Sequence, residues 1–223
     1  MKKFLLATVV LLGSISLANA ERFNIGITAT GALFQADGAS EIFSGAHAGD
    51  VSSTTVTKNA ADEGEDAEAA VVMGSIFFEV AASDKVSLGV NYVPHTMDSE
   101  TVENIQNVGG TGVLGTGNDA ESRNTVKVSF EDLTTIYALA NVNDNFYAKV
   151  GYVQVEVITD ENLATGGAYG NTDLDGYMIG LGYNMDLPDG MFARFEASYM
   201  DLDGATVTND NDSTKSVKAD GID

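Results

Sequence analysis

The sequence predicts an all-β fold: an antiparallel up-and-down β-barrel of about eight strands. Three observations lead to this expectation. Apolar and small residues alternate at period two in several segments, short turns alternate with long polar connections, and no stretch after the N-terminus has the apolar length of a membrane-spanning helix. Because alternate side chains of a strand point to opposite faces, each periodic segment is expected to have one apolar face.

The N-terminus has the pattern of a secretory signal. Two lysines precede an apolar run from Phe4 to Leu17, and residues 18–20 (Ala-Asn-Ala) supply the small residues of a cleavage site. An uncleaved anchor is the alternative, but it needs about 20 apolar residues, and this run is shorter. We therefore expect residues 1–20 to be a cleaved signal peptide and residues 21–223 to form the barrel.

The expected strands begin just after the signal. Residues 23–33 alternate apolar with small or polar side chains, and the alternation returns over 86–92 and 177–183. Ile136 and Tyr137 lie where a bulge is expected, so the face that each takes stays open. The less regular segments that complete a set of seven strands are 69–81, 123–142 with a bulge near 131–133, 146–158 and 191–201.

The two faces of these strands indicate the surroundings of the barrel. One face carries aliphatic and aromatic side chains, and the other is rich in Gly, Ser, Thr and Asn. A soluble β-sandwich is the alternative, and it would bury its larger apolar residues and leave polar ones in water. Small and polar residues opposite aromatic ones suit better a narrow transmembrane barrel, with lipid outside and small or polar groups inside.

Connection lengths also alternate along the chain. Short turns are expected at 82–84, 143–145 and 188–190, and long polar segments at about 34–68, 94–122, 159–173 and 202–218. Outer-membrane barrels have this arrangement, with short periplasmic turns and long extracellular loops. Seven strands leave an odd number, and residues 217–223 read as the beginning of an eighth, so we expect the last strand to be incomplete in this chain.

Together, these features resemble the small outer-membrane β-barrel family and are similar to the membrane domain of outer-membrane protein A. The resemblance covers nearly all of residues 21–223 and rests on architecture, without a unique motif. It implies a monomer in the outer membrane of a Gram-negative-type bacterium, in contact with outer-membrane lipid and lipopolysaccharide and inserted by the barrel assembly machinery. Members end in an aromatic residue that this machinery recognises, whereas this chain ends in Asp223.

Charge and cysteine content exclude several partners and linkages. The chain has 33 acidic and 11 basic residues and a net charge of −22. Such a charge argues against nucleic acid or anionic headgroups as direct partners and favours attraction of cations. Because the chain has no cysteine, neither a disulfide nor an acylated cysteine is possible.

Four charged residues are expected to point into the barrel near its short turns. Parity places Glu79, Lys149, Arg194 and Glu196 on inward faces. Charges inside a narrow barrel must be paired or hydrated, so these four are predicted to form an ion-pair cluster that plugs the lumen. The cluster is either core filling, since eight-stranded interiors are just wide enough for side chains, or the gate of a small pore.

Two Asp-Leu-Asp-Gly segments, 173–176 and 201–204, are expected at the outer ends of neighbouring strands. Carboxylate oxygens are suitable ligands for Ca²⁺ or Mg²⁺, which makes Asp173, Asp175, Asp201 and Asp203 candidate ligands. The alternative is that Asp and Gly simply end strands, because the twelve-residue calcium loop with its terminal Glu is absent. No other cofactor is expected.

Aromatic residues near strand ends are expected to form interfacial girdles rather than a stacking platform for a ligand. An enzyme is not expected, because His47 and His95 are the only histidines and neither has a defined catalytic partner in the sequence. Two functions stay open: a surface-exposed scaffold with acidic extracellular loops for envelope integrity, adhesion or recognition, and a narrow porin-like channel for small cationic solutes. The expected girdle residues are Tyr92, Tyr177, Tyr183, Phe192 and Tyr199.

Overall fold

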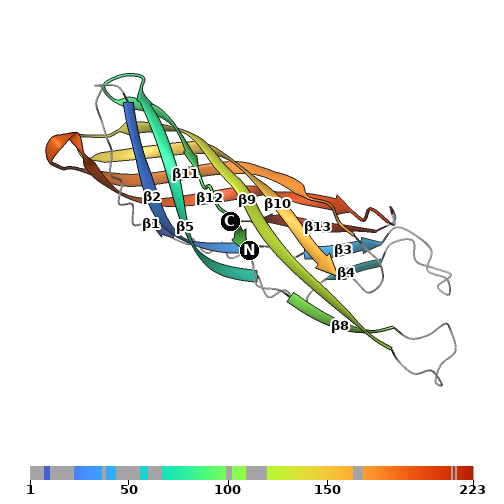
Figure 1. Ribbon diagram of the computed structural model, residues 1–223. Coiled ribbons are helices and arrows are strands. Elements are labelled where there is room, and N and C mark those ends of the chain that lie inside the picture. The colour runs from blue at the N-terminus through green and yellow to red at the C-terminus, as the bar shows by residue number, and fades with distance from the viewer. Residues whose placement is uncertain are drawn as a thin grey trace.

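The computed structural model of the chain is almost entirely β-structure, which confirms the all-β antiparallel expectation (Figure 1). Within the described ranges, no helix is long and apolar enough to cross a membrane. The structure describes residues 8–10, 23–36, 39–43, 56–59, 67–98, 102–108, 120–162, 168–211, 213 and 215–222.

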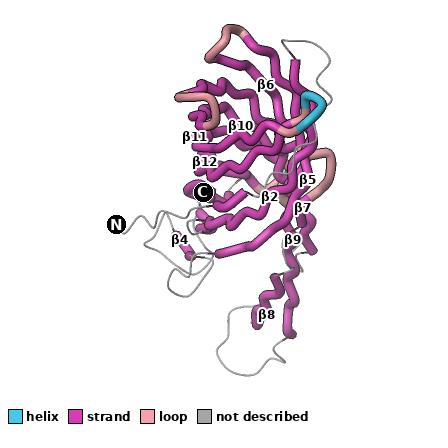
Figure 2. The backbone as a smooth tube through the Cα atoms, turned by 90° about the vertical axis from the view of Figure 1, so that its left-hand side faces the viewer, coloured by secondary structure: helices cyan, strands magenta, loops and turns pink. Residues whose placement is uncertain are grey.

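Eight strands pair in a ring, which agrees with the expected number. The order is β12-β11-β10-β9-β6-β5-β2-β13, and β13 pairs with β12 as well as with β2. All these pairings are antiparallel, and the sheet curls into a half-barrel whose two edges are joined through β13, which pairs with β2 only at Ile222 and Ala36 (Figure 2). The strands are β2 (Phe23–Ala36), β5 (Ala67–Ala81), β6 (Val86–Tyr92), β9 (Ala120–Asn141), β10 (Phe146–Asn162), β11 (Thr172–Asp186), β12 (Phe192–Thr208) and β13 (Lys215–Ile222).

The short turns connect β5 to β6, β9 to β10 and β11 to β12 at one end, called here the turn end; the opposite end is the loop end. At the loop end, the expectation of long polar loops was partly wrong. These segments contain β3 (Ala39–Phe43), β4 (Val56–Asn59), β7 (Met97–Asp98) and β8 (Val102–Val108). They pair because β13 and β9 extend far enough to offer unpaired backbone groups, which need hydrogen-bond partners.

A short strand, β1 (Thr8–Val10), lies within the segment expected to be a signal peptide. It pairs with β12 over Glu196–Ser198, near the turn end. β13 pairs with β12 only from Leu202 onward and with β2 only at Ala36, so it covers the loop-end part of the same edge. Cleavage after residue 20 would therefore leave this stretch of β12 without β1.

Side chains alternate between the two faces of the sheet, except at a bulge in β9. In β11, Ile179 and Leu181 are exposed on the outer face, and Gly180 between them is buried on the inner face. The same parity in β9 places Ile136 outward, 63% exposed, and Tyr137 inward, 3% exposed. The sequence left these two faces open because the bulge breaks the parity count along β9.

The bulge expected near residues 131–133 is confirmed. The register between β9 and β10 shifts so that Asp132 and Leu133 together face Val155. Asp132 has φ of 55°, in the left-handed region that residues with a Cβ rarely adopt. Its carboxylate accepts a hydrogen bond of 2.6 Å from the hydroxyl of Tyr92 at the end of β6. The extra residue thus ties β9 to β6.

The interior differs between the two halves of the barrel. At the turn end, the buried residues include all four buried charges, beside the apolar side chains of Phe77 and Leu139. Toward the loop end, most buried residues are apolar and form one cluster, named here the apolar tier, although Ser129 and Asn209 are also buried there. The expectation of small or polar groups throughout the interior was therefore wrong for the loop-end half. The buried members of the tier are Met73, Val93, Met97, Leu133, Val153, Val155, Val157, Leu174, Met178 and Leu202.

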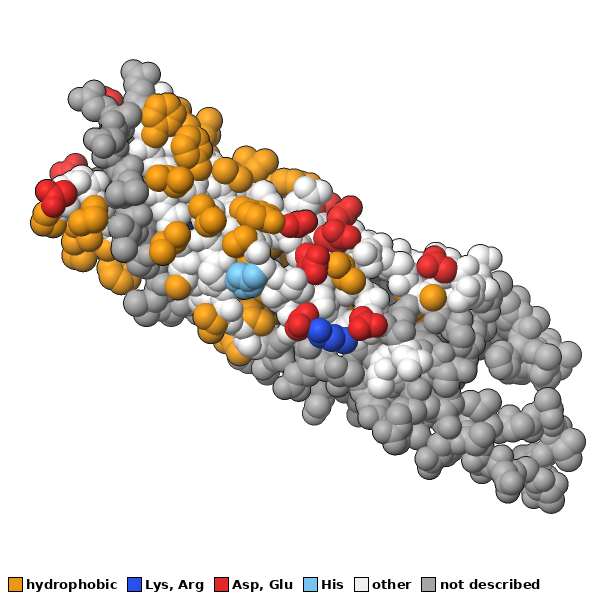
Figure 3. All heavy atoms as spheres, in the orientation of Figure 1, with side chains coloured by type: hydrophobic (Ala, Val, Ile, Leu, Met, Phe, Trp, Pro, Cys, Tyr) orange, Lys and Arg blue, Asp and Glu red, His pale blue; other side chains and the backbone are white. Residues whose placement is uncertain are grey.

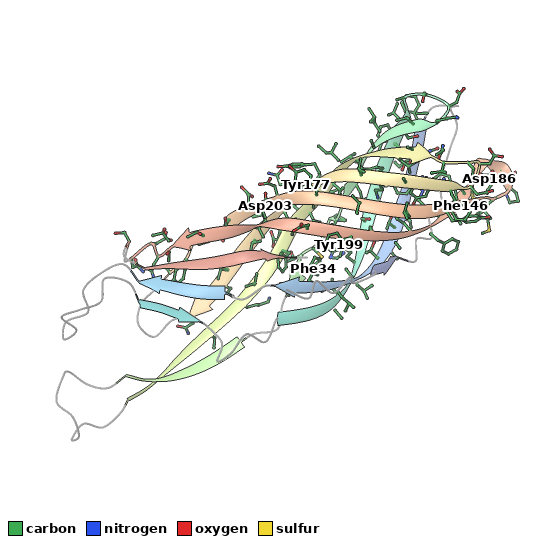
Figure 4. The ribbon with its side chains drawn as sticks, turned by 180° about the vertical axis from the view of Figure 1, so that it is seen from behind. Phe34, Phe146, Tyr177, Asp186, Tyr199 and Asp203 are labelled. Carbon is green, nitrogen blue, oxygen red and sulfur yellow. The ribbon has the colours of Figure 1, made fainter. Side chains whose placement is uncertain are left out.

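The outer surface changes from apolar to acidic along the strands, at about the level where the interior becomes mostly apolar. Along β10, the outward positions change from Val150 and Tyr152 to Gln154 and Glu156. On the face drawn in Figure 3, apolar side chains are spread over the turn-end half, with acidic ones at its tip, and further acidic side chains follow toward the loop end. Figure 4 shows Phe146 near the turn end and Tyr177 closer to the middle, beside Asp203. The turn-end half is thus apolar outside and contains the buried charges inside, whereas the loop-end half is acidic outside and mostly apolar inside.

Backbone strain at the bulge can be tested by comparing Asp132→Val with Asp132→Gly. Both variants lose the hydrogen bond to Tyr92, but only valine keeps a branched Cβ at positive φ. We expect Asp132→Val to have a free energy of unfolding about 1 kcal/mol lower than Asp132→Gly. Guanidinium unfolding in detergent micelles, followed by circular dichroism, measures this difference. Equal midpoints would show that the bulge does not constrain this residue.

Candidate functional site

The structure brings together all four charged residues expected in the lumen. Arg194 donates from Nη1 to Glu79 Oε1 at 2.5 Å and from Nη2 to Oε2 at 3.1 Å. Lys149 Nζ donates to Glu196 Oε1 at 2.9 Å. The four side chains are between 1% and 7% exposed, and the other buried polar residues of the described chain are uncharged. We call this group the plug.

Two buried tyrosines complete the hydrogen bonding of the plug. Tyr137 donates to Glu79 Oε1 at 2.8 Å, and Tyr147 donates to Glu196 Oε2 at 2.6 Å. Asn24 of β2 adds a weaker bond of 3.3 Å to Glu79. Because a buried charge without partners is costly, these bonds are what make two carboxylates tolerable inside the barrel.

Strand register explains how the tyrosines reach the carboxylates. Tyr137 in β9 lies opposite Gly89 in β6, which lies opposite Glu79 in β5. A Cβ at Gly89 would be 2.5 Å from Tyr137 Cζ, so the ring crosses the glycine to the next strand. The second row has the same order, with Tyr147 in β10, Gly182 in β11 and Glu196 in β12, and a Cβ at Gly182 would be 2.1 Å from Tyr147 Cζ.

Aromatic rings surround the guanidinium of Arg194. Its Cζ lies 5.0 Å from the ring centroid of Tyr147, 5.1 Å from that of Phe192 and 5.4 Å from that of Phe77. Its Nε donates to Asn184 Oδ1 at 2.9 Å. Phe192 therefore faces the interior, and its assignment to an outer girdle was wrong, because it lies two residues from Arg194 and shares its face.

Below the plug, the turn end opens into a polar hollow of about 370 Å³. Arg194 contributes to its wall, and its guanidinium is already held by Glu79 and Asn184. Three asparagines and two aspartates provide further polar groups, so the hollow suits water and small polar molecules. Its lining residues are Asn24, Asn141, Asp144, Asn184, Asp186, Leu187, Gly190, Met191, Phe192 and Arg194.

The four candidate metal-binding aspartates lie on the outer face, beyond Tyr177. Asp201 pairs with Tyr177 in register, so the side chains of Asp175 and Asp203 are neighbours on adjacent strands, while Asp173 faces β10. Among the residues that the structure describes, no group of three or more His, Cys, Asp or Glu side chains is arranged to hold a metal ion. All four aspartates are exposed, and Figure 4 labels Asp203 among them.

His95 has backbone partners. Its Nε2 accepts a hydrogen bond from the Gly74 amide at 3.0 Å, which leaves Nδ1 to donate to the carbonyl of Thr96, 3.3 Å away. No carboxylate orients the ring through these two bonds, so this geometry is not that of an activated base. His47 lies outside the described residues.

Asp98, the acidic residue nearest His95 in sequence, has other partners. It accepts hydrogen bonds from Lys127 Nζ at 2.8 Å and from the Ser129 hydroxyl at 2.7 Å. The bond from Lys127 and then that from Ser129 lower the pKa of the Asp98 carboxyl. These contacts fix β7 on β9 at the loop end.

Sequence reasoning found the charges of the plug but missed its tyrosines and glycines. The parity of β10 places Tyr147 on the same face as Lys149, so the sequence pattern could have predicted its inward position. The parity of Tyr137 was hidden by the bulge, and the glycine positions depend on strand register, which the sequence does not give. Comparisons with family models, curated proteins and solved structures found no match for this chain.

The crossing of Tyr147 over Gly182 predicts that Gly182→Ala destabilises the barrel by about 1 to 3 kcal/mol, because the methyl group displaces the ring from Glu196. Guanidinium unfolding in detergent measures the loss. Gly31→Ala is the matched control, since a Cβ at Gly31 meets nothing within 4 Å. Equal midpoints for the two variants would contradict the predicted role of this glycine.

Proposed function

We propose that this chain is an outer-membrane β-barrel that acts as a closed, surface-exposed scaffold and presents its acidic loop end outside the cell. The observation that carries the proposal is the exposed apolar band on its turn-end half. In water, such a continuous band would be strongly unfavourable, whereas lipid would cover it. Its described members include Phe23, Ile25, Ile27, Val72, Ile76, Phe78, Leu88, Val90, Ile136, Val150, Ile179, Leu181 and Phe195.

Aromatic side chains border this band, as at the interfaces of membrane barrels. Near the turn end, Phe146 contacts Tyr183 with ring centroids 5.0 Å apart. At the other border, Tyr152 and Tyr177 are 6.3 Å apart. The outward apolar residues of β11 extend past Tyr183 to Met185, which is 41% exposed. From Tyr177 to Met185, β11 advances about 26 Å, and strand tilt reduces this length to about 20 Å of height. This height is close to the apolar band of known barrels, about 25 Å.

The filled interior supports the scaffold function over the channel. The plug satisfies its charges internally, and the apolar tier fills the other half. A narrow channel for small cationic solutes is the second candidate, favoured by the polar hollow that reaches Arg194. Enzymatic activity has no support in the described geometry of His95.

The proposal includes export and surroundings. The first twenty residues are removed on secretion, the assembly machinery inserts a monomer, and lipid and lipopolysaccharide surround the apolar band. The aspartates beyond Tyr177 then lie at headgroup depth, where dissolved Ca²⁺ or Mg²⁺ can reduce their repulsion from lipid phosphates. Function resides in the loop end, which serves envelope integrity, adhesion or recognition.

Membrane orientation can be tested by cysteine labelling, because the chain has no native cysteine. We expect Asp210→Cys, at the loop end, to react with a membrane-impermeant maleimide on intact cells of a Gram-negative host. Asp144→Cys, in a short turn, is the matched control and is expected to react only after the outer membrane is permeabilised. Labelling of Asp144→Cys on intact cells, or of neither variant, would contradict a loop end exposed outside.

The lipid-facing assignment predicts that Leu181→Arg lowers the free energy of unfolding by about 2 to 4 kcal/mol, because Leu181 lies in the middle of the apolar band. Gln154→Arg is the control, since this outward position lies beyond the band. Guanidinium titration of both variants in phospholipid vesicles gives the two values. A similar small effect at both sites would show that lipid does not cover Leu181.

A further inference from the structure

We propose that the apolar tier is a second barrier to ions, which keeps the barrel closed even when the Glu79–Arg194 ion pair of the plug is broken. The proposal rests on the membrane scaffold proposed above and adds how its lumen is sealed. It assigns the barrier to side chains that carry no charge and no hydrogen-bonding group, in a half of the interior that the ion pairs do not reach.

The plug and the apolar tier are successive regions of the same lumen. Lys149 and Val155 both face inward on β10, six residues apart, which corresponds to about 20 Å along the strand. Arg194 and Leu202 are separated in the same way on β12, by eight residues. A hydrated ion that travels along the interior must therefore pass both regions, and opening one leaves the other in place.

The tier extends across the interior. Its buried members come from β5, β7, β9, β10, β11 and β12 and from Val93, which follows β6, and Val153, Val155 and Leu202 are at most 2% exposed. Phe34 of β2 stacks on Phe130 of β9 with centroids 6.0 Å apart and an interplanar angle of 8°. Because β5 and β6 lie between β2 and β9 in the sheet, this pair closes the space across the curve of the barrel.

The chemistry of the tier opposes ions strongly. The described buried charges all belong to the plug, and the buried members of the tier are valines, leucines and methionines, whose side chains cannot replace the hydration shell of an ion. Removing that shell costs several kcal/mol per ion, and hydrophobic constrictions exclude even water. Methionines such as Met73 and Met178 have flexible side chains that fill irregular gaps, which helps the tier to stay sealed as the strands fluctuate.

Planar-bilayer recording of the full chain distinguishes one barrier from two. One variant is Arg194→Ala, which removes an ion pair of the plug. The second is a triple substitution of the tier, Val153→Ser with Val155→Ser and Met178→Ser, and the third combines the two. We expect silence from the wild type, from Arg194→Ala and from the triple variant, and conductance only from the combination. Replacing the three serines by alanines is the matched control and is expected to give at least tenfold less current.

Each other outcome is informative when heat-modifiable migration shows a folded barrel. Conductance of Arg194→Ala without tier substitutions would overturn the second barrier, as would silence of the folded combined variant. Conductance of the triple variant by itself would also overturn the proposal of two barriers, because an intact plug would then fail to block ions. Channels formed by the wild type would instead overturn the closed scaffold, so the two failures can be told apart.

A second measurement needs no tier substitution. With ¹³C-labelled methionine methyl groups, the unsubstituted protein in micelles is expected to show no cross-relaxation between water and the methyls of Met73 and Met178. Met191, at the wall of the polar hollow, is the positive control for contact with water. Water contacts at Met73 or Met178 equal to those at Met191 would overturn a dry tier.

Discussion

The structure depends on one constraint: a curled sheet has two faces, and period two assigns each residue to one of them. Every strand must therefore suit two surroundings at once. In β10, Val150 and Tyr152 face outward while Tyr147 and Lys149 face inward, and Val155, six residues after Lys149, also faces inward. The same backbone thus presents an apolar exterior in one half and an apolar interior in the other.

Burying charge inside this sheet requires a specific register. Each carboxylate of the plug is reached by a tyrosine from two strands away, and the strand between them contributes a glycine over which the ring lies. The ion pairs Glu79–Arg194 and Lys149–Glu196 then cross between strands far apart in sequence. A shift of one residue in any of these pairings would turn a charge toward the outer surface. The plug and the register therefore stabilise each other.

The inversion of polarity reconciles two architectures that the sequence pattern offered as alternatives. The turn-end half follows the rule of a membrane barrel, with apolar residues outside. The loop-end half follows the rule of a soluble β-structure, with Leu174 and Leu202 inside and Asp173, Asp175 and Asp203 outside. A barrel that continues beyond the lipid as a water-exposed sheet with its own apolar core can hold loops rigidly above the surface, which suits the proposed scaffold.

The sequence by itself determined the properties that period two and turn chemistry encode locally. These include the all-β class, the short turns, the bulge near Asp132 and the inward direction of Glu79, Lys149, Arg194 and Glu196. The tertiary structure decided everything that depends on which strands are neighbours. Register and curvature decide the ion-pair partners, the glycines beneath Tyr137 and Tyr147 and the inward position of Phe192. They also decide the extra strands in the long connections and the apolar tier. Those result from long-range pairing, which no local pattern specifies.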